Sequence, residues 1–134
     1  MTAPAVLFVC VHNAGRSQMA AAWFNKMCDR SKARAISAGT QPGEHVHPEV
    51  VQAMREEGID LYGVKPQFLS TELAQQATLL VTMGCGDACP YVPGLKKLDW
   101  SLPDPKDQPI ESVRKIRDEI RERVAALATE RNWL

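Results

Sequence analysis

An apolar run that ends at a cysteine near the start of the chain limits the possible folds more than any other feature. Residues 5–9 are continuously apolar, residues 10–17 read Cys-Val-His-Asn-Ala-Gly-Arg-Ser, and a helical pattern follows. Continuous apolar runs are typical of strands buried on both faces, and such strands belong to parallel sheets covered by helices. The chain therefore begins with a strand, a tight loop and a helix, the first unit of an α/β fold.

The remaining sequence continues this alternation of strands and helices. Strands are predicted at Ala5–Val9, Arg34–Ser37, Thr78–Met83 and Lys96–Asp99, and helices at Gln18–Cys28, Pro48–Gly58, from Ser70 onward and at Ile110–Glu130. Helical spacing predicts that the buried faces carry Met19, Ala22, Trp23 and Met27, then Val50, Val51 and Met54, and finally Val113, Ile116, Ile120, Val124 and Leu127. We expect a parallel sheet with helices on both faces and a site at the carboxyl ends of its strands.

The loop after the first strand has the residues of an oxyanion site. Cys10 and Arg16 are separated by five residues, and a curled loop would turn the N–H groups of residues 11–16 inward. The Arg16 guanidinium can bind two oxygens of a tetrahedral anion, and the same positive field favours the thiolate of Cys10. Ser17 could cap the helix or contact the Cys10 sulfur. The predicted oxyanion-binding group is Val11, His12, Asn13, Ala14, Gly15, Arg16 and Ser17.

Asp104 is the candidate proton donor. It lies between Pro103 and Pro105, which stiffen the segment, and a fixed carboxylic acid suits general acid catalysis. The alternative is that Asp104 and Asp107 only shape a turn.

Length, charge and cysteine content restrict the class of protein. The chain of 134 residues suits one domain spanning residues 1–134, and its 16 basic and 16 acidic residues cancel, which disfavours a nucleic-acid partner. We expect a cytoplasmic protein with no membrane segment, in which four cysteines serve redox or metal chemistry more often than structural disulfides. His45 and His47 could bind zinc with Cys85 and Cys89, but a solvated histidine pair is the commoner case and we expect no metal.

These motifs together resemble the low-molecular-weight protein tyrosine phosphatase family, and within it the arsenate reductases that share its fold. Besides the loop, Ser37-Ala38-Gly39-Thr40 and residues 99–105, Asp-Trp-Ser-Leu-Pro-Asp-Pro, occur in the order of that family, so the resemblance covers nearly the full chain. It implies a single-domain three-layer αβα fold with a four-stranded parallel sheet. It also implies that Cys10 attacks the anion while Asp104 protonates the leaving oxygen. We expect a monomer without a bound cofactor.

The resemblance implies a second step that depends on Cys85 and Cys89. An arsenate reductase needs a thiol that attacks the Cys10–arsenic adduct, releases arsenite and leaves a disulfide. We expect Cys85 to attack Cys10 and Cys89 to attack Cys85, with thioredoxin as the external reductant. Mycothiol with mycoredoxin, or another small thiol, is the alternative reductant. The alternative functions are a low-molecular-weight tyrosine phosphatase and a catalytically silent oxyanion-binding domain.

Several positions depart from the patterns of that family. Lys106 and Asp107 stand where the tyrosine phosphatases carry aromatic residues after Asp-Pro, which favours a small inorganic anion. Gly15 replaces a cysteine that thioredoxin-coupled members often have. Members that bind potassium use the loop asparagine, here Asn13, with an acid on the first helix, where this chain has Ala21 and Ala22. We therefore expect no potassium, a bracing or turn role for Asn13, and a buried, unreactive thiol at Cys28.

Overall fold

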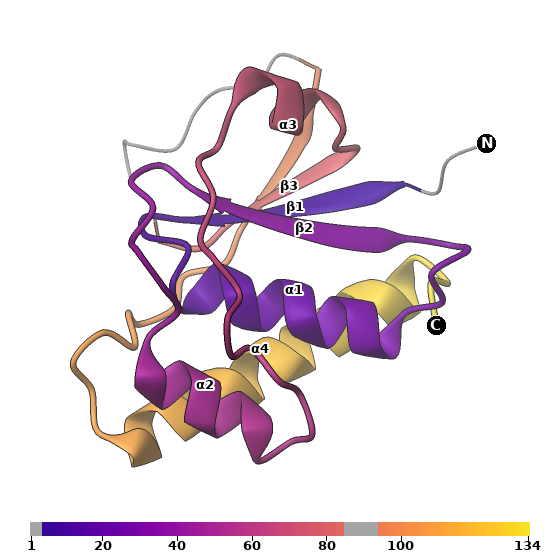
Figure 1. The fold of residues 1–134 in the computed structure, drawn as a ribbon. Helices are drawn as coiled ribbons and strands as arrows, with labels where there is room; N and C mark the ends of the chain where they lie inside the picture. Colours follow the sequence, from indigo (N-terminus) through magenta and orange to yellow (C-terminus); the bar gives the residue numbers. More distant parts are fainter. Residues whose placement is uncertain (1–3, 85–93) are drawn as a thin grey trace.

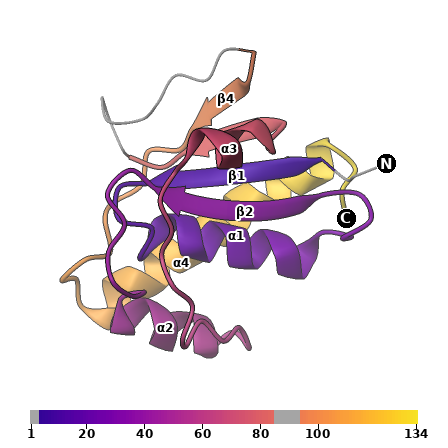
Figure 2. The same ribbon diagram turned by 45° about the horizontal axis from the view of Figure 1, so that its top comes forward.

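The computed structural model describes residues 4–84 and 94–134 and has an α/β architecture built on one parallel sheet. In chain order its elements are β1 (Ala5–Cys10), α1 (Arg16–Met27), β2 (Arg34–Gly39), α2 (Pro48–Arg55), α3 (Thr71–Gln75), β3 (Leu79–Thr82), β4 (Lys96–Asp99) and α4 (Ile110–Glu130). The strand order is β2-β1-β3-β4, and all three neighbouring pairs are parallel. Helices cover both faces, which confirms the predicted three-layer fold (Figures 1 and 2).

The two faces of the sheet bury cores of different size. α1, α2 and α4 lie on one face and the short α3 on the other (Figure 1). The larger core is centred on Phe8, whose ring lies 5.9 Å from that of Phe24 and 5.7 Å from that of Trp100. The smaller core contains Leu7, Val9 and Leu80 from the strands and Ala74 from α3. Alternate side chains of β1 therefore enter different cores, so all six of its residues are buried.

The residues predicted to form the buried faces of the helices are buried in most cases but not in all. All five apolar residues predicted for α4 are buried, as are Val50 and Met54 of α2, whereas Val51 is only partly buried. In α1 the prediction was wrong in part, because Ala22 and Met27 are only partly buried whereas Ala20 and Phe24 are fully buried. α1 packs against β1, β2 and α4, so its buried face is wider than one stripe.

The register aligns the carboxyl ends of the strands. Cys10 pairs with Gly39, Val9 with Thr82, and Thr82 with Asp99. The segments that follow β1, β2, β3 and β4 consequently begin at one edge of the sheet, where parallel folds place their sites. Among the described residues, no helix is both long and apolar enough to cross a membrane.

Candidate active site

The loop between β1 and α1 is held from outside by the segment that follows β2. The carbonyl oxygens of Val11, His12 and Ala14 accept hydrogen bonds from the main-chain N–H groups of Gln41, Gly43 and His47 at 2.8–2.9 Å. In a trans peptide the next N–H points away from the carbonyl, so the N–H groups of residues 12, 13 and 15 point away from this segment. This orientation is the one that an anion-binding nest requires.

Two backbone features allow this curl. Asn13 has a φ of 51°, in the left-handed region that asparagine tolerates better than most residues. A Cβ on Gly39 would lie 2.6 Å from the Val11 carbonyl oxygen and 2.9 Å from the Asn13 nitrogen. Glycine at the end of β2 therefore lets the loop pass close to the sheet.

Cys10 ends β1 with its sulfur beside Ser17. The residue is 2% exposed, and its Sγ lies 2.9 Å from the Ser17 Oγ. α1 begins after Gly15 with no side-chain cap, so Ser17 contacts the sulfur and does not cap the helix. The start of α1 and the Ser17 hydroxyl therefore both lie beside the candidate nucleophile.

Asn13 is the centre of a buried polar cluster behind the loop. Its Nδ2 donates to Ser17 Oγ at 2.7 Å, and its Oδ1 accepts from Gln18 Nε2 and the main-chain N–H of Gln67, both at 3.0 Å. Asn13 therefore braces the loop and also adopts the turn conformation. Because two N–H donors face Oδ1, this arrangement does not fit a potassium ion there.

Arg16 and Asp104 meet over the loop. Arg16 donates from Nη1 to the Leu102 carbonyl at 3.3 Å, and its Nη2 lies 3.6 Å from Asp104 Oδ2. The Arg16 side chain is 8% exposed whereas that of Asp104 is 46% exposed. The guanidinium is thus fixed at the base of the site and the carboxyl lies at its opening.

The proline loop is packed against the oxyanion loop. Pro105 is buried, and a Cβ on Gly15 would lie 2.6 Å from its Cγ. Asp104 Oδ1 accepts the main-chain N–H of Lys106 at 3.0 Å, so the carboxyl also shapes a local turn. The structure thus shows the turn-shaping contact of Asp104, and its role as proton donor stays a prediction.

A cavity of about 280 Å³ borders the loop. It is lined by His12, Ala14, Gly43, Glu44, His45, His47 and Lys106. Burial lowers the pKa of His47, and the charges of Asp104 and Glu49 oppose this effect in part. His45 and His47 line the cavity, but residues 4–84 and 94–134 contain no cluster of three or more metal-ligating side chains.

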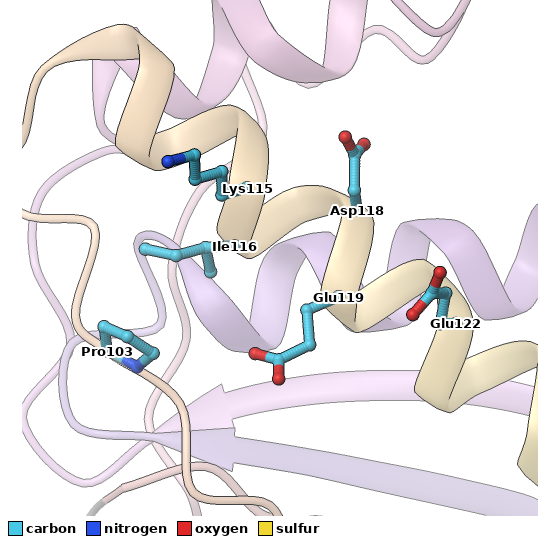
Figure 3. A pocket seen from close by; sticks show the side chains of 6 residues that line it. All are labelled: Pro103, Lys115, Ile116, Asp118, Glu119 and Glu122. Atoms are coloured by element: carbon cyan, nitrogen blue, oxygen red, sulfur yellow. The ribbon is translucent and has the colours of Figure 1, made fainter.

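A second cavity, between Pro103 and α4, has a lining with an excess of negative charge. Its volume is about 400 Å³, and its lining includes the carboxylates of Asp118, Glu119 and Glu122 with Lys115 as the one cationic side chain (Figure 3). An excess of negative charge opposes binding of an oxyanion, so the loop remains the candidate site.

The sequence pattern identified the loop and Asp104 but missed several residues that hold them. Gln67 contacts Asn13 from a segment 54 positions further along the chain, and Leu102 supplies the carbonyl that fixes Arg16. No local signal marks either residue. Cys85 and Cys89 lie outside the described residues. Gly84, the residue before Cys85, approaches Arg16 so closely that a Cβ would overlap its Nη1.

Comparison with known proteins agrees with this geometry. The family model described as low molecular weight phosphotyrosine protein phosphatase matches residues 5–132. This chain belongs to that phosphatase family. Cys10, Arg16 and Asp104 remain the candidate site residues of this fold. Cys28 is buried in the larger core, and burial raises the pKa of its thiol.

The relatives of this phosphatase-family chain include arsenate reductases. A Halobacterium salinarum protein, provisionally named an arsenate reductase, is 41% identical over 129 residues, covering 93% of this chain and 91% of its own length. Arsenate reductase 2 of Staphylococcus haemolyticus is 32% identical over 128 residues, 92% of this chain and 95% of its own. The solved thioredoxin-dependent arsenate reductase Cg_ArsC1' of Corynebacterium glutamicum is 36% identical with a TM-score of 0.84. It matches 98% of this chain, which spans only 63% of that longer protein.

Proposed function

We propose that the protein is a cytoplasmic arsenate reductase that works through Cys10, Cys85 and Cys89. The proposal is carried by the approach of Gly84 to Arg16, because Cys85 is the next residue in the sequence. The chain thus enters the segment that carries Cys85 and Cys89 from a residue in contact with the oxyanion-binding arginine, which supports a redox step in addition to anion binding. The names of the relatives, arsenate reductases of three genera, support the same chemistry.

The first step forms the adduct. The loop N–H groups and Arg16 bind the arsenate oxygens, and the Cys10 thiolate attacks arsenic(V). The leaving oxygen takes the proton of Asp104 and departs as water. Arsenic is still pentavalent at this stage, and the Cys10 sulfur is bonded to it.

The second step reduces arsenic. The thiolate of Cys85 attacks the Cys10 sulfur, the sulfur–arsenic bond breaks, and its electron pair stays on arsenic, which leaves as arsenite. Cys89 then attacks Cys85 and frees Cys10, which leaves a Cys85–Cys89 disulfide. Thioredoxin supplies the two electrons that reopen this disulfide, consistent with the thioredoxin dependence printed for the C. glutamicum protein. Mycothiol with mycoredoxin is the alternative reductant.

Phosphatase activity is the second candidate, favoured by the family to which the chain belongs. Arsenate reduction and phosphate ester hydrolysis would use the same nucleophile, arginine and acid. They differ only in the second step, in which a thiol attacks in the reductase and water attacks in the phosphatase. Lys106 after the Asp104-Pro105 pair is exposed and lines the cavity beside the loop, where it replaces an aromatic wall for a tyrosine ring. This charge favours a small anion over phosphotyrosine.

The test is arsenite production over many turnovers with thioredoxin, thioredoxin reductase and NADPH. Hydrolysis of p-nitrophenyl phosphate is measured beside it. The wild type is compared with Cys85→Ser and Cys89→Ser, and Cys28→Ser is the matched control because Cys28 lies in the core.

We expect sustained reduction in the wild type and in Cys28→Ser, and loss of turnover in the other two variants. Reduction that needs mycothiol and mycoredoxin would replace thioredoxin as the partner. Strong hydrolysis without arsenite release would reject the reductase and leave a phosphatase.

A further inference from the structure

A chain of hydrogen bonds behind the loop ends at the Cys10 sulfur. We propose that Gln18 and the main-chain N–H of Gln67 are positioning groups for Cys10. By holding the Asn13 amide in one orientation, they direct the hydrogen of the Ser17 hydroxyl toward the sulfur. This inference rests on the proposed function, in which Cys10 is the nucleophile.

The orientation of Asn13 follows from the group that faces it. A main-chain N–H can only donate, and the Gln67 nitrogen lies 3.0 Å from Asn13 Oδ1. The Gln18 amide adds a second donor at the same distance. Asn13 is fully buried, so turning its amide would place N–H groups against one another without water to compensate. The oxygen is therefore fixed toward Gln67.

The orientation of Asn13 then sets that of Ser17. With Oδ1 fixed, Nδ2 faces Ser17 Oγ at 2.7 Å and donates to it. The Ser17 oxygen is the acceptor in that bond, so its own hydrogen is available for the Cys10 sulfur at 2.9 Å. A hydrogen bond donated to a charged thiolate is stronger than one donated to a thiol. The chain of bonds thus favours the reactive form of Cys10.

Gln67 is itself anchored to the end of β2. Its Nε2 donates to the Ser37 carbonyl at 2.8 Å, and its carbonyl accepts the Gly39 N–H at 2.9 Å. Leu69 N–H also bonds the Gly39 carbonyl at 2.9 Å. The donor that fixes Asn13 is consequently held by the sheet itself, at the strand end where the oxyanion loop also passes.

The test is the rate of Cys10 alkylation by iodoacetamide as a function of pH, with Cys10 identified by peptide mass spectrometry. Gln67→Pro removes the main-chain N–H and the side-chain amide, whereas the matched control Gln67→Ala removes only the side-chain amide. Gln18→Met removes the second donor at similar volume. We expect slower alkylation at pH 7 in Gln67→Pro and Gln18→Met, about tenfold slower when they are combined, and a smaller loss in Gln67→Ala, which keeps the main-chain N–H but loses the side-chain bond to Ser37.

The same changes in a Ser17→Ala background separate positioning from general damage. If Gln18 and Gln67 act through the Ser17 hydroxyl, they have no further effect on alkylation once that hydroxyl is gone. An equal loss in the Ser17→Ala background, or normal alkylation in the folded double variant, would overturn the proposal. Should Gln67→Pro fail to fold, Gln18→Met with and without Ser17→Ala decides the matter by the same criterion.

Alkylation needs neither arsenate nor a reductant. The proposal can therefore fail while arsenate reduction is intact. Conversely, a protein that hydrolyses phosphate esters without reducing arsenate would still show the predicted alkylation profile.

Discussion

Gly84 lies against the guanidinium of Arg16 and has a φ of 87°. A side chain at this position would therefore collide with Arg16 and would also strain the backbone. We predict that Gly84→Ala weakens oxyanion binding about tenfold or more, because the new methyl group displaces Arg16 from the loop. A tenfold loss corresponds to about 1.4 kcal/mol. The measurement is the inhibition constant of phosphate against p-nitrophenyl phosphate hydrolysis.

The matched control for Gly84 is Gly63. Its φ is 81°, and a Cβ there would meet no described atom within 4 Å. Gly63→Ala has the backbone strain, about 1–2 kcal/mol, without the contact. Equal phosphate inhibition of the two variants would show that backbone strain, and not displacement of Arg16, explains the loss.

Asp104 provides the second prediction for a single residue. Asp104→Asn retains an oxygen for the Lys106 N–H, so the turn is preserved, but the proton donor is gone. We expect the rate of adduct formation to fall about 10²- to 10⁴-fold, measured as single-turnover chemistry at saturating arsenate. The control is Asp107→Asn, whose φ of 59° asparagine tolerates. If Asp104→Asn forms the adduct at a rate within about twofold of the wild type, Asp104 is not the proton donor.

At the scale of elements, α2 is joined to α4 by a charge cluster. Glu56, just after α2, accepts from Arg114 Nη2 at 2.7 Å and from Arg117 Nη1 at 2.9 Å. Hydrogen bonding to Arg114 lowers the pKa of Glu56 from 4.5 to about 2, with a further contribution from Arg117. A carboxyl whose folded-state pKa is lowered stabilises the fold above its unfolded pKa and loses that contribution as the pH falls through the folded value.

We therefore predict that Glu56→Gln unfolds at a lower temperature than the wild type at pH 7. The difference should shrink as the pH falls from about 4.5 to about 2, where Glu56 becomes protonated in both states. Thermal unfolding followed by circular dichroism over this range measures it. Glu119→Gln, which loses an exposed pair with Arg123 at 3.7 Å, is the control and should change little. A difference for Glu56→Gln that does not vary with pH would contradict the assigned cause.

Elements were more predictable from the sequence than their contacts. α4 begins and ends at the predicted residues, because its apolar spacing is regular over 21 positions. α1 begins at Arg16, two residues earlier than predicted, because the helix follows the oxyanion loop directly, with no residues between them. Ser17, Cys10 and Arg16 could be grouped from one motif, whereas Gln67 could not, because its role depends on a main-chain N–H brought to the loop by the sheet.

At the scale of the whole molecule, stability depends on Phe8. This fully buried side chain of β1 contacts the rings of Phe24 in α1 and Trp100 after β4, so it connects three parts of the larger core. We predict that Phe8→Ala costs about 3–5 kcal/mol, a large share of the 5–15 kcal/mol typical of a domain. Chemical denaturation measures the loss. Tyr62→Ala, at a side chain 80% exposed, should change stability by about 0.5 kcal/mol or less.

The position of β1 in the sheet keeps Cys10 in place during the proposed reaction. β1 is bonded to β2 on one side and to β3 on the other, and Cys10 is its last residue. Moving the Cys10 backbone would break its pairing with Gly39 at the end of a strand held between β2 and β3, so in the proposed reaction every partner has to be delivered to a stationary sulfur. A change of reductant, or of the step that follows adduct formation, would then need no change in the backbone of Cys10.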